Sequence, residues 1–441
     1  MRPAPSPALP APRAGVILAA GRSERLRGFT GGGSKALVRL GGLALLERAI
    51  RTLLRAGLDR VCVVVGYHAG PVAAVARRAS PLVHVVVAED WEEGNAASLA
   101  AVEPLLDGEP SFLLMTADHV FSPGALDGLV LAGQPAVLVD RDVDPATWEE
   151  ATRVEVDAGG GVIRLGKDVS SPVVDCGAFL LEGGVFDAVR RARAGGDATL
   201  SAALTAWGRL RARPIPTGAW WQDVDTEEDL RAARRTVRRS LRRPSDGPVA
   251  RFLNRTVSVP VSWALAPLRP SPTLLSWIAW ATVVAGAALL ATGRGLAGGL
   301  LVQAGSILDG VDGEVARLTV RDRPGGALLD GFLDRISDVA VAGGLGVWAL
   351  AQGAEPRIAL ALALAATAGS LLSMAIKDRI VALGMLGPSE DALGWLLGGR
   401  DGRLLVVAVL AATGLPAVAL GAIAATSLVA TTLRVLLARP R

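Results

Sequence analysis

The first half of the chain alternates short apolar runs with amphipathic segments. Four of the runs have the length and composition of buried parallel strands: residues 15–19, 61–65, 83–88 and 112–116. Residues 43–56, which are followed by Gly57, have the spacing of a helix that crosses between two strands. This alternation predicts an α/β domain with a Rossmann-like mixed sheet. Ligands bind beyond the carboxyl ends of strands in such sheets, so the residues after these runs are the functional candidates.

Beyond residue 269 the pattern changes to long runs with few or no charges. These runs lie at residues 270–293, 295–308, 339–354, 358–376 and 404–433. The last is longer than the ~20 residues that one crossing needs and contains Gly414 and Pro416, so we divide it in two. The pattern therefore predicts an all-α domain of six transmembrane helices. An even number leaves both ends in the cytoplasm, which agrees with the closing Arg434, Arg439 and Arg441.

Length and composition agree with a division into domains. A chain of 441 residues exceeds what one hydrophobic core usually serves. The first twelve residues are rich in proline and lack the continuous apolar core of a signal peptide, so we expect a disordered tail there. The expected segments are a tail at residues 1–12, a soluble α/β domain at 13–240, a basic and amphipathic juxtamembrane segment at 241–268 and a membrane domain at 269–441.

The formal net charge is only +4, but arginines gather where the two halves meet. They are Arg231, Arg234, Arg235, Arg238, Arg239, Arg242 and Arg243. An anionic leaflet and the positive-inside rule both favour arginine at such a junction. Nucleic-acid binding is the competing interpretation, but no aromatic residue is interleaved and a long apolar region follows. We therefore expect a lipid bilayer and no nucleic acid as partner.

The first predicted strand runs into a loop of small residues. Leu18, Ala19, Ala20 and Gly21 would let backbone N–H groups approach the oxygens of a bound triphosphate. Two basic side chains downstream, Arg25 and Lys35, would supply compensating positive charge. The loop is not a Walker A sequence, because no GxxxxGK[ST] is present. The strand, the loop and the downstream lysine together predict a nucleotide-phosphate site.

Residues 13–230 resemble the nucleoside-triphosphate transferases, which include sugar-phosphate and inositol-phosphate nucleotidyltransferases. The resemblance rests on LAAGRSERL, SKAL, WEEGNAASL, Asp118, Lys167 and WQDVDT, in that order. It implies that Lys35 and Arg25 assist catalysis, that Asn95 lies near the base or sugar and that Lys167 lies at the acceptor phosphate. Many members have glycine where Ser23 stands, which is a departure in the phosphate turn.

The same resemblance implies a site for Mg²⁺ (or Mn²⁺). Asp118 and one of Asp223 or Asp225 would hold the ion, which suits the preference of Mg²⁺ for carboxylate and phosphate oxygens. Asp118 could instead be a turn residue, Asp225 could belong to a helix N-cap and Lys167 could be an ordinary surface lysine. We interpret the three histidines as structural, with His119 a weak exception because it adjoins Asp118.

The second half contains a longer motif of charged and small residues. It reads Asp309-x2-Asp312-Gly313-x2-Ala316-Arg317-x8-Gly326-x3-Asp330-x3-Asp334. Its aspartates lie one helical turn apart in two pairs, so two neighbouring helices could direct four carboxylates to one place. Carboxylates within a membrane imply ions, protons or catalysis. A cation channel or a proton-coupled transporter would satisfy this argument equally.

The complete motif resembles the signature of CDP-alcohol phosphotransferases, and the resemblance covers residues 245–437. It implies that Asp309, Asp312 and Asp330 bind two divalent ions with help from Asp334, which would also be the general base. Gly313 would admit the nucleotide and Arg317 would face phosphate. Asp338 continues the same helical face, and we interpret it as solvent or cap chemistry. For Lys377, Arg379, Arg400 and Arg403, interfacial anchoring and acceptor-phosphate binding stay open.

The order of the two signatures resembles the family of bifunctional inositol-1-phosphate cytidylyltransferases and di-myo-inositol phosphate phosphate synthases. It implies that CTP and inositol 1-phosphate give CDP-inositol, which then passes phosphoinositol to a second inositol 1-phosphate and releases CMP. The alternatives are a phospholipid synthase with a lipid acceptor and a nucleotide-regulated transporter without catalysis. We expect a multi-pass protein of the cell membrane whose soluble domain is cytoplasmic, and a homodimer through the membrane domain is left open. Cys62 and Cys176 suit that reducing compartment, because they form no CxxC pair.

Overall fold

The computed structural model describes residues 8–387, 393 and 395–440, and the chain divides into two compact units. The first is Met1–Thr236 and the second is Val237–Arg441. Residues 1–7 of the expected tail lie outside the described residues. Its later part is held in place, because the Leu9 amide donates to the Gly133 carbonyl at 2.7 Å and Ser111 Oγ donates to the Pro10 carbonyl at 2.9 Å.

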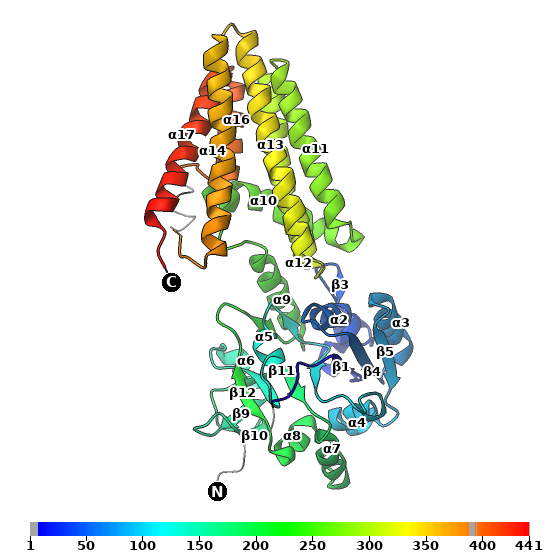
Figure 1. Cartoon of the computed structure of the whole chain (residues 1–441). Helices are drawn as coiled ribbons and strands as arrows, with labels where there is room; N and C mark the ends of the chain where they lie inside the picture. Colours follow the sequence, from blue (N-terminus) through cyan, green and yellow to red (C-terminus); the bar gives the residue numbers. More distant parts are fainter. Residues whose placement is uncertain (1–7, 388–392, 394, 441) are drawn as a thin grey trace. The chain divides into compact units, whose positions relative to one another are not determined.

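The first unit is built on a mixed sheet that has nine strands within the described residues (Figure 1). The predicted strands are β1 (Ala14–Ala19), β4 (Arg60–Val65), β5 (Val83–Val87) and β6 (Phe112–Thr116), and they run parallel in the order β6-β1-β4-β5. β11 (Val174–Leu181) pairs antiparallel with β6 and makes the sheet mixed. Beyond it lie β8 (Ala136–Asp140), β9 (Arg153–Val156), β10 (Val162–Gly166) and β12 (Arg211–Pro214). The predicted α/β fold with a mixed sheet is confirmed.

Helices cover both faces of this sheet. Side chains alternate along each strand, so Val16 and Leu18 join one buried cluster while Ile17 joins the other. The first cluster is covered by α4 (Asn95–Ala100), α7 (Val185–Ala194) and α8 (Leu200–Trp207), and the second by α2 (Leu45–Arg55), α3 (Ala69–Ala79) and α5 (Asp127–Val130). The remaining helices of this unit are α1 (Arg27–Thr30), α6 (Pro145–Glu150) and α9 (Glu227–Ser240), which continues into the second unit.

One predicted strand is less buried than its sequence indicated. β5 pairs only with β4 among the described strands and forms an edge of the sheet, and Val87 at its end is 59% exposed. The prediction of a buried strand was therefore wrong here. A run of β-branched residues favours an extended strand, but its position in the sheet depends on tertiary neighbours. Two short pairs complete the unit: β2 (Arg39–Leu40) with β3 (Leu43–Ala44), and β7 (Val120–Phe121) with β13 (Trp221–Gln222).

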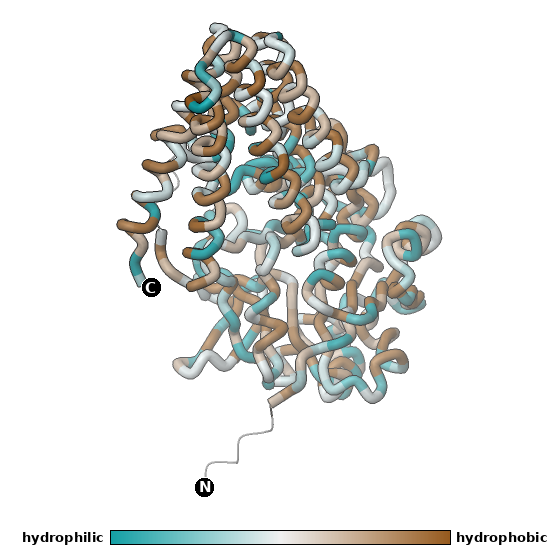
Figure 2. Tube along the Cα trace, turned by 45° about the horizontal axis from the view of Figure 1, so that its top comes forward, coloured by the Kyte–Doolittle hydropathy of each residue, from teal (hydrophilic) through white to brown (hydrophobic). Residues whose placement is uncertain are grey.

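The second unit is helical. After the last turn of α9 it contains a helical stretch composed of η5 (Ala250–Asn254), α10 (Arg255–Leu265) and η6 (Ala266–Leu268). Six longer helices follow in the described residues: α11 (Pro272–Ala291), α12 (Gly295–Leu318), α13 (Pro324–Ala351), α14 (Pro356–Ala382), α16 (Arg400–Ala412) and α17 (Pro416–Leu437). Figure 2 shows hydrophobic residues along these helices, interrupted by a few hydrophilic positions. Three of them, α11, α14 and α17, are long and apolar enough to cross a membrane by length and composition.

Two of the helices extend well beyond their apolar runs. α12 continues past residue 308 to Leu318, and α13 begins at Pro324 rather than near residue 339. The added turns carry the aspartates of the second motif, which interrupt the apolar pattern without interrupting the backbone hydrogen bonds. The apolar runs therefore mark only part of each helix, and the aspartates lie on two helices as their spacing predicted.

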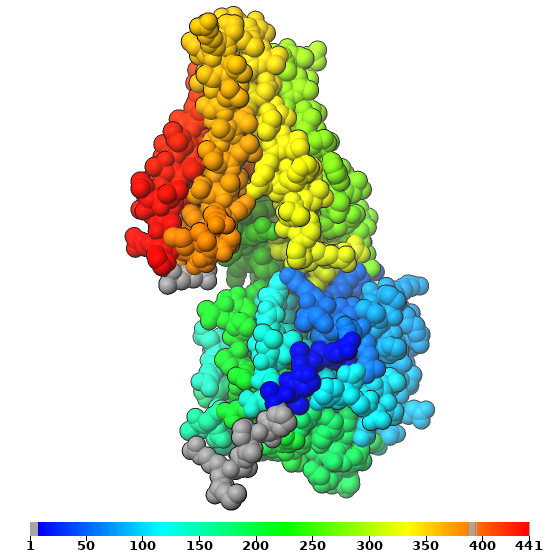
Figure 3. Space-filling view, viewed as in Figure 1, coloured from blue at the N-terminus to red at the C-terminus, as the bar shows by residue number. Residues whose placement is uncertain are grey.

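Small residues allow the helices of this unit to pack closely. A Cβ atom on Gly286 of α11 would lie 2.9 Å from the Gly298 carbonyl oxygen of α12, and one on Gly344 of α13 would collide with the Ala287 carbonyl of α11. Such close approach of backbones is common between membrane helices. α13 and α14, yellow and orange in Figure 3, also contact each other.

Candidate active sites

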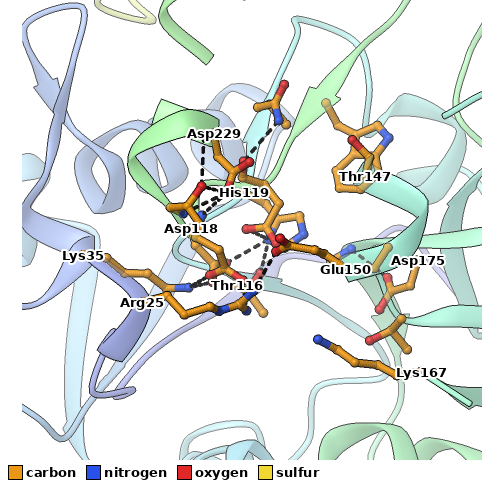
Figure 4. A pocket seen from close by; sticks show the side chains of 18 of the residues that line it. Arg25, Lys35, Thr116, Asp118, His119, Thr147, Glu150, Lys167, Asp175 and Asp229 are labelled. Atoms are coloured by element: carbon orange, nitrogen blue, oxygen red, sulfur yellow. Dashed lines mark hydrogen bonds and ion pairs between the residues drawn. The ribbon is translucent and has the colours of Figure 1, made fainter. Parts of the chain in front are cut away.

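A cavity of about 830 Å³ opens in the first unit, beyond the carboxyl ends of β1 and β6. Figure 4 shows Lys35 and Arg25 on one side of it and Lys167 and Asp175 on the other. Asp118, Asp223 and Asp225 line the same cavity, as does Asn95 at the start of α4. The structure therefore brings together predicted residues that lie as far apart in sequence as Arg25 and Asp225.

The loop after β1 is held in a shape that directs Lys35 into this cavity. Ser23 adopts a left-handed conformation, with φ 58°, and its Oγ accepts a hydrogen bond from the Lys35 amide at 2.9 Å. This conformation costs little for glycine but is uncommon for serine, which explains why the family often has glycine at the position. The strain is local, and the serine hydroxyl returns a hydrogen bond that glycine could not supply.

Lys35 lies between two carboxylates. Its ammonium group contacts Asp118 and Asp225, and its side chain is 20% exposed. Burial acts to lower the pKa of Lys35, but Asp118, Asp225 and Asp223 outweigh it and the pKa is raised. Arg25 contacts Asp225 as well and pairs with Glu150 of α6 at 2.7 Å. Positive charge therefore faces the part of the cavity where the resemblance places the nucleotide phosphates.

Asp118, His119 and Asp223 form a compact group whose ligand atoms lie within 4.8 Å of one another. His119 Nδ1 lies 2.8 Å from Asp118 Oδ1 and 3.9 Å from Asp223 Oδ1. Burial acts to lower the pKa of His119, but Asp223 and Asp118 outweigh it and raise that pKa to about 9. Burial raises the pKa of Asp223 to about 6, and its Oδ1 is buried without a hydrogen-bond partner in the described part of the chain. An unsatisfied carboxylate oxygen beside a second carboxylate fits a divalent cation.

These contacts bear on the choice that the sequence left open. Asp225 is already paired with two cations, whereas Asp223 belongs to the compact group, so Asp223 is the better placed of the two. The helix N-cap at this point is Thr226, whose Oγ1 accepts from the Asp229 amide at 3.2 Å while Asp229 accepts from the Thr226 amide at 2.8 Å. The metal roles of all three predicted aspartates stay predictions.

His119 takes a larger part in the site than its sequence indicated. Its ring is stacked on Trp221, with centroids 5.6 Å apart and planes at 4°, and a Cβ atom on Gly177 would lie 2.7 Å from the ring. The ring therefore has little freedom to turn away from Asp118. The sequence carried one signal of this, the adjacency of the two residues, but the stacking partner lies more than 100 residues away.

A second group of carboxylates lies in the helical unit. Asp309 of α12 and Asp330 and Asp334 of α13 have ligand atoms within 4.8 Å of one another. Asp312 lies outside this group, and its carboxylate accepts a hydrogen bond from Ser276 of α11. Three converging carboxylates are hard oxygen ligands of the kind that divalent cations prefer. The structure therefore supports the predicted convergence for three of the four aspartates.

Arg400, the first residue of α16, compensates this negative charge. Its Nη1 lies 2.9 Å from Asp334 and 3.1 Å from Asp309. Asp338 is buried and pairs with Arg403 at 3.1 Å, so our interpretation of Asp338 as solvent or cap chemistry was wrong. One extra turn of α13 carries Asp338 into the bundle, where an arginine of α16 neutralises it.

A cavity of about 260 Å³ adjoins these carboxylates. Its lining includes Asp309, Asp330, Asp334 and Arg400, together with Lys377 of α14 and Arg434 of α17. Arg434 is buried and donates to Ser373 Oγ at 2.6 Å. Arg255 and Glu314, to which sequence reasoning gave no role in the site, form an ion pair at 2.8 Å nearby. Glu314 stands at an unspecified position of the motif and Arg255 lies outside it, so the motif gave no signal of this pair.

Comparison with known proteins relates these two sites to two families. The chain matches a MobA-like NTP transferase domain over residues 15–167 and the CDP-alcohol phosphatidyltransferase family over residues 270–399. A bifunctional IPC transferase and DIPP synthase from Rubrobacter xylanophilus is 37% identical over 413 residues, which cover 92% of each chain. The chain belongs to the family of bifunctional IPC transferases and DIPP synthases. A further member, from Aquifex aeolicus, is 30% identical and covers 90% of this chain and 92% of its own.

One solved structure similar to the first unit is the inositol-1-phosphate CTP transferase from T. maritima. It is 24% identical with a TM-score of 0.46, and the match covers 50% of this chain and 92% of that chain.

Membership of the bifunctional family makes the chain an enzyme with two catalytic domains. The nucleotidyltransferase domain contains the group of Asp118, His119 and Asp223, and the CDP-alcohol phosphotransferase domain contains the group of Asp309, Asp330 and Asp334. Enzymes of both kinds generally use divalent metal ions, and each domain offers one carboxylate group of suitable chemistry.

Proposed function

We propose that the enzyme makes CDP-inositol from CTP and inositol 1-phosphate and then transfers its phosphoinositol group to a second inositol 1-phosphate. The product is phosphorylated di-myo-inositol phosphate, and pyrophosphate and CMP are released. The observation that carries this proposal is the presence of two separate carboxylate sites on one chain, each within the domain whose family performs one of the steps. The names of the whole-length relatives support the choice of inositol.

In the first step, a phosphate oxygen of inositol 1-phosphate attacks the α-phosphorus of CTP, and the bond to pyrophosphate breaks. Lys35 and Arg25 face the triphosphate and offset its charge, while Asn95 holds the base or sugar. Lys167, across the cavity, binds the acceptor phosphate (Figure 4). Positioning and charge compensation supply most of the catalysis, so this step needs no nucleophilic side chain.

In the second step, a hydroxyl of the second inositol 1-phosphate attacks the phosphorus next to the donor inositol. The bond to CMP breaks, and Asp334 accepts the hydroxyl proton. Arg400 holds the Asp334 carboxylate in position through its contact at 2.9 Å. The cavity residues Lys377 and Arg434 offer positive charge for the phosphate of the acceptor.

The metal that we propose for both sites is Mg²⁺. Asp118 with Asp223 or Asp225 would hold it in the first domain, and Asp309, Asp312, Asp330 and Asp334 in the second, where it would offset charge on the reacting phosphates. We also propose that all six long helices cross the membrane and that the nucleotidyltransferase domain is cytoplasmic. α12 and α13 are less apolar because they carry aspartates, and Arg400 offsets the charge of Asp309 and Asp334. α16 has 13 residues, about 20 Å of helix, and is the shortest of the six. A homodimer through the membrane domain stays a prediction.

The test is to incubate the purified full-length protein with CTP, Mg²⁺ and inositol 1-phosphate and to identify the products by mass. We expect CDP-inositol at early times and phosphorylated di-myo-inositol phosphate later. Glycerol 3-phosphate serves as the matched alternative phosphoalcohol. Preferential use of that compound would contradict the assignment. So would transfer to a lipid alcohol, instead of the soluble acceptor, when the protein is held in lipid nanodiscs.

A further inference from the structure

Two arginine side chains meet over one glycine of the second motif. The position that a Cβ atom on Gly313 would occupy lies 3.1 Å from Arg317 Nη1 and 3.6 Å from Arg243 Nη2. Arg317 lies on α12, one turn beyond Gly313, whereas Arg243 comes from the segment that follows α9. Both guanidinium groups therefore approach the same bare stretch of helix from different parts of the chain.

Carboxylates lie near both arginines without forming ion pairs with them. Within the described residues no ion pair joins Arg243 or Arg317 to an acidic side chain. Arg317 donates from Nη2 to the Leu241 carbonyl at 3.1 Å, and its Nε is buried without a hydrogen-bond partner in the described part of the chain. Two like charges that converge in this way repel each other unless an anion lies between them. The arrangement therefore indicates an anion site.

Arg243 lies beside the carboxylate group that would hold the metal in the proposed function. Arg243 lines the 260 Å³ cavity together with Asp309, Asp330 and Asp334. A nucleoside diphosphate is an anion that needs contacts of both kinds, because its phosphate oxygens bind a divalent cation on one side and guanidinium groups on the other. Gly313 leaves room for it, since no side chain separates the arginines from the helix.

A chain of part-buried contacts holds the backbone of Arg243 in place. Asp246 accepts a hydrogen bond from the Arg243 amide at 2.8 Å, and the Asp246 amide donates to the Arg243 carbonyl at 3.0 Å, which closes the turn. Arg255 donates two further hydrogen bonds to the Asp246 carboxylate, at 2.9 and 3.0 Å. The turn that carries Arg243 is thus tied to α10.

The same chain of contacts continues to α12. Arg255 pairs with Glu314 at 2.8 Å, and Glu314 is completely buried and also accepts from Ser258 and Ser262 at 2.6 Å each. A Cβ atom on Gly310 would collide with Arg255 Nη1, so glycine is needed there for the guanidinium to reach Glu314. Glu314 is the residue after Gly313. The helix that carries the motif therefore sets the position of the turn that carries Arg243.

We propose that Arg243, with Arg317, binds the diphosphate of the CDP-activated donor in the second step, and that Asp246, Arg255 and Glu314 are positioning residues for it. This inference rests on the proposed function of the helical unit. Arg243 lies outside residues 270–399, the part of the chain that matches the CDP-alcohol phosphatidyltransferase family. The juxtamembrane segment is then part of the donor site as well as a contact for the membrane surface.

The first experiment compares Arg243→Ala with the wild type in nanodiscs of neutral phosphatidylcholine, with CDP-inositol supplied and CMP release measured. A charge-assisted hydrogen bond is worth roughly 1.5–3 kcal/mol, so we expect the KM for CDP-inositol to rise about 10- to 100-fold while kcat changes less. Arg243→Lys should recover part of the affinity, because it restores the charge without the fork of donors. Pyrophosphate release from CTP by the same preparation reports how much folded protein is present.

Arg242→Ala is the matched control, because Arg242 is exposed like Arg243 but does not line the cavity. It should leave the KM unchanged. An equal rise in KM in both variants would show general attraction of anions by the basic segment and would overturn the proposal. So would an unchanged KM in Arg243→Ala, or a loss that occurs only when the nanodiscs contain anionic lipid, which would assign Arg243 to a lipid headgroup.

CDP is a second probe, because it carries the diphosphate without the alcohol. The full-length protein should bind CDP at two sites, and Arg243→Ala should lower the affinity of one of them. This result is expected whichever alcohol the enzyme uses. If the wild type releases no CMP from CDP-inositol, the proposed substrate is wrong, and CDP binding still tests the diphosphate site. Undiminished CDP binding at both sites would overturn the inference itself.

The positioning role is tested by Asp246→Asn, which keeps the side-chain volume and removes the charge that Arg255 contacts. We expect a smaller rise in the KM for CDP-inositol than in Arg243→Ala. Combining the two changes should add little, because both act through one guanidinium group. If the two effects multiply, Asp246 acts independently of Arg243 and the positioning role is wrong.

Discussion

Asp118→Asn tests whether the two catalytic sites act separately. The change keeps nearly the same side-chain volume and removes one negative charge from the centre of the first cavity. Asp118 contacts the Lys35 ammonium group and lies 2.8 Å from His119 Nδ1. Burial acts to raise the pKa of this carboxyl, but both contacts outweigh it and hold the pKa well below its ordinary value. The substitution therefore removes charge from two polar contacts and from the proposed metal site at once.

The expected losses differ in size for stability and for rate. Each charge-assisted hydrogen bond is worth roughly 1.5–3 kcal/mol, but Lys35 keeps Asp225 and the asparagine can still accept from His119, so the folded domain should survive. Loss of a metal ligand removes several kcal/mol of transition-state stabilisation, which corresponds to about 1,000-fold or more in rate. Pyrophosphate release should therefore fall far more than the melting temperature indicates.

The assay follows two products separately in the full-length protein. Asp118→Asn should abolish pyrophosphate release from CTP and still release CMP when CDP-inositol is supplied. The reciprocal variant, Asp334→Asn, should accumulate CDP-inositol and lose CMP release by about 100- to 10,000-fold, as expected for a positioned general base. Independent catalysis would be refuted if Asp118→Asn, in folded protein, also stopped CMP release from supplied donor. Unchanged CMP release in Asp334→Asn would show that another group accepts the proton.

Three further predictions concern the first domain. Lys35→Ala leaves Asp118 and Asp225 without their shared cation, so pyrophosphate release should fall about 100-fold or more. The melting temperature should also fall, and Mg²⁺ should restore part of it. Normal turnover with a large loss of melting temperature would show that Lys35 is structural. Burial raises the pKa of Asp175 to about 7, so the folded state holds this proton more tightly than the unfolded state and stability falls as pH rises from about 4 to 7. Asp175→Asn should lack that fall, and a stability difference independent of pH, measured by thermal unfolding, would contradict the cause. Gly94 has a φ of 140°, and Gly94→Ala would place a Cβ atom 2.5 Å from the Ala198 carbonyl oxygen. The melting temperature should therefore drop by an amount equivalent to about 1–3 kcal/mol. An unchanged melting temperature would show that the loop adapts.

The local signals in the sequence were sufficient for much of the fold. β1, β4 and β6 were predicted because a central parallel strand is buried on both faces and must be apolar at nearly every position. The apolar centres of the six helices of the second unit were found in the same way. Lys35 followed from its place after the strand and the loop of small residues, and the convergence of the second motif's aspartates followed from their helical spacing. The role of Asp118 came from the resemblance to the nucleoside-triphosphate transferases.

Features that depend on distant neighbours escaped the sequence. The exposure of β5 follows from its place at an edge of the sheet, where no further strand among the described residues covers it, and the charge compensation of Asp309 and Asp334 comes from Arg400 of another helix. The position of His119 depends on Trp221, which lies on another strand pair.

By itself, then, the sequence determined which chemistry the chain carries and where the four parallel strands and the long helices of the second unit lie, because both depend on residue type and local period. The tertiary structure alone decided which of those residues meet. Asp223 rather than Asp225 lies beside His119, Asp338 is buried against Arg403, and Arg243 faces Arg317 across Gly313. Each of these pairings joins residues that are distant along the chain or alike in type. Neither the hydrophobic period nor the composition distinguishes a side chain that has a partner from one that has none.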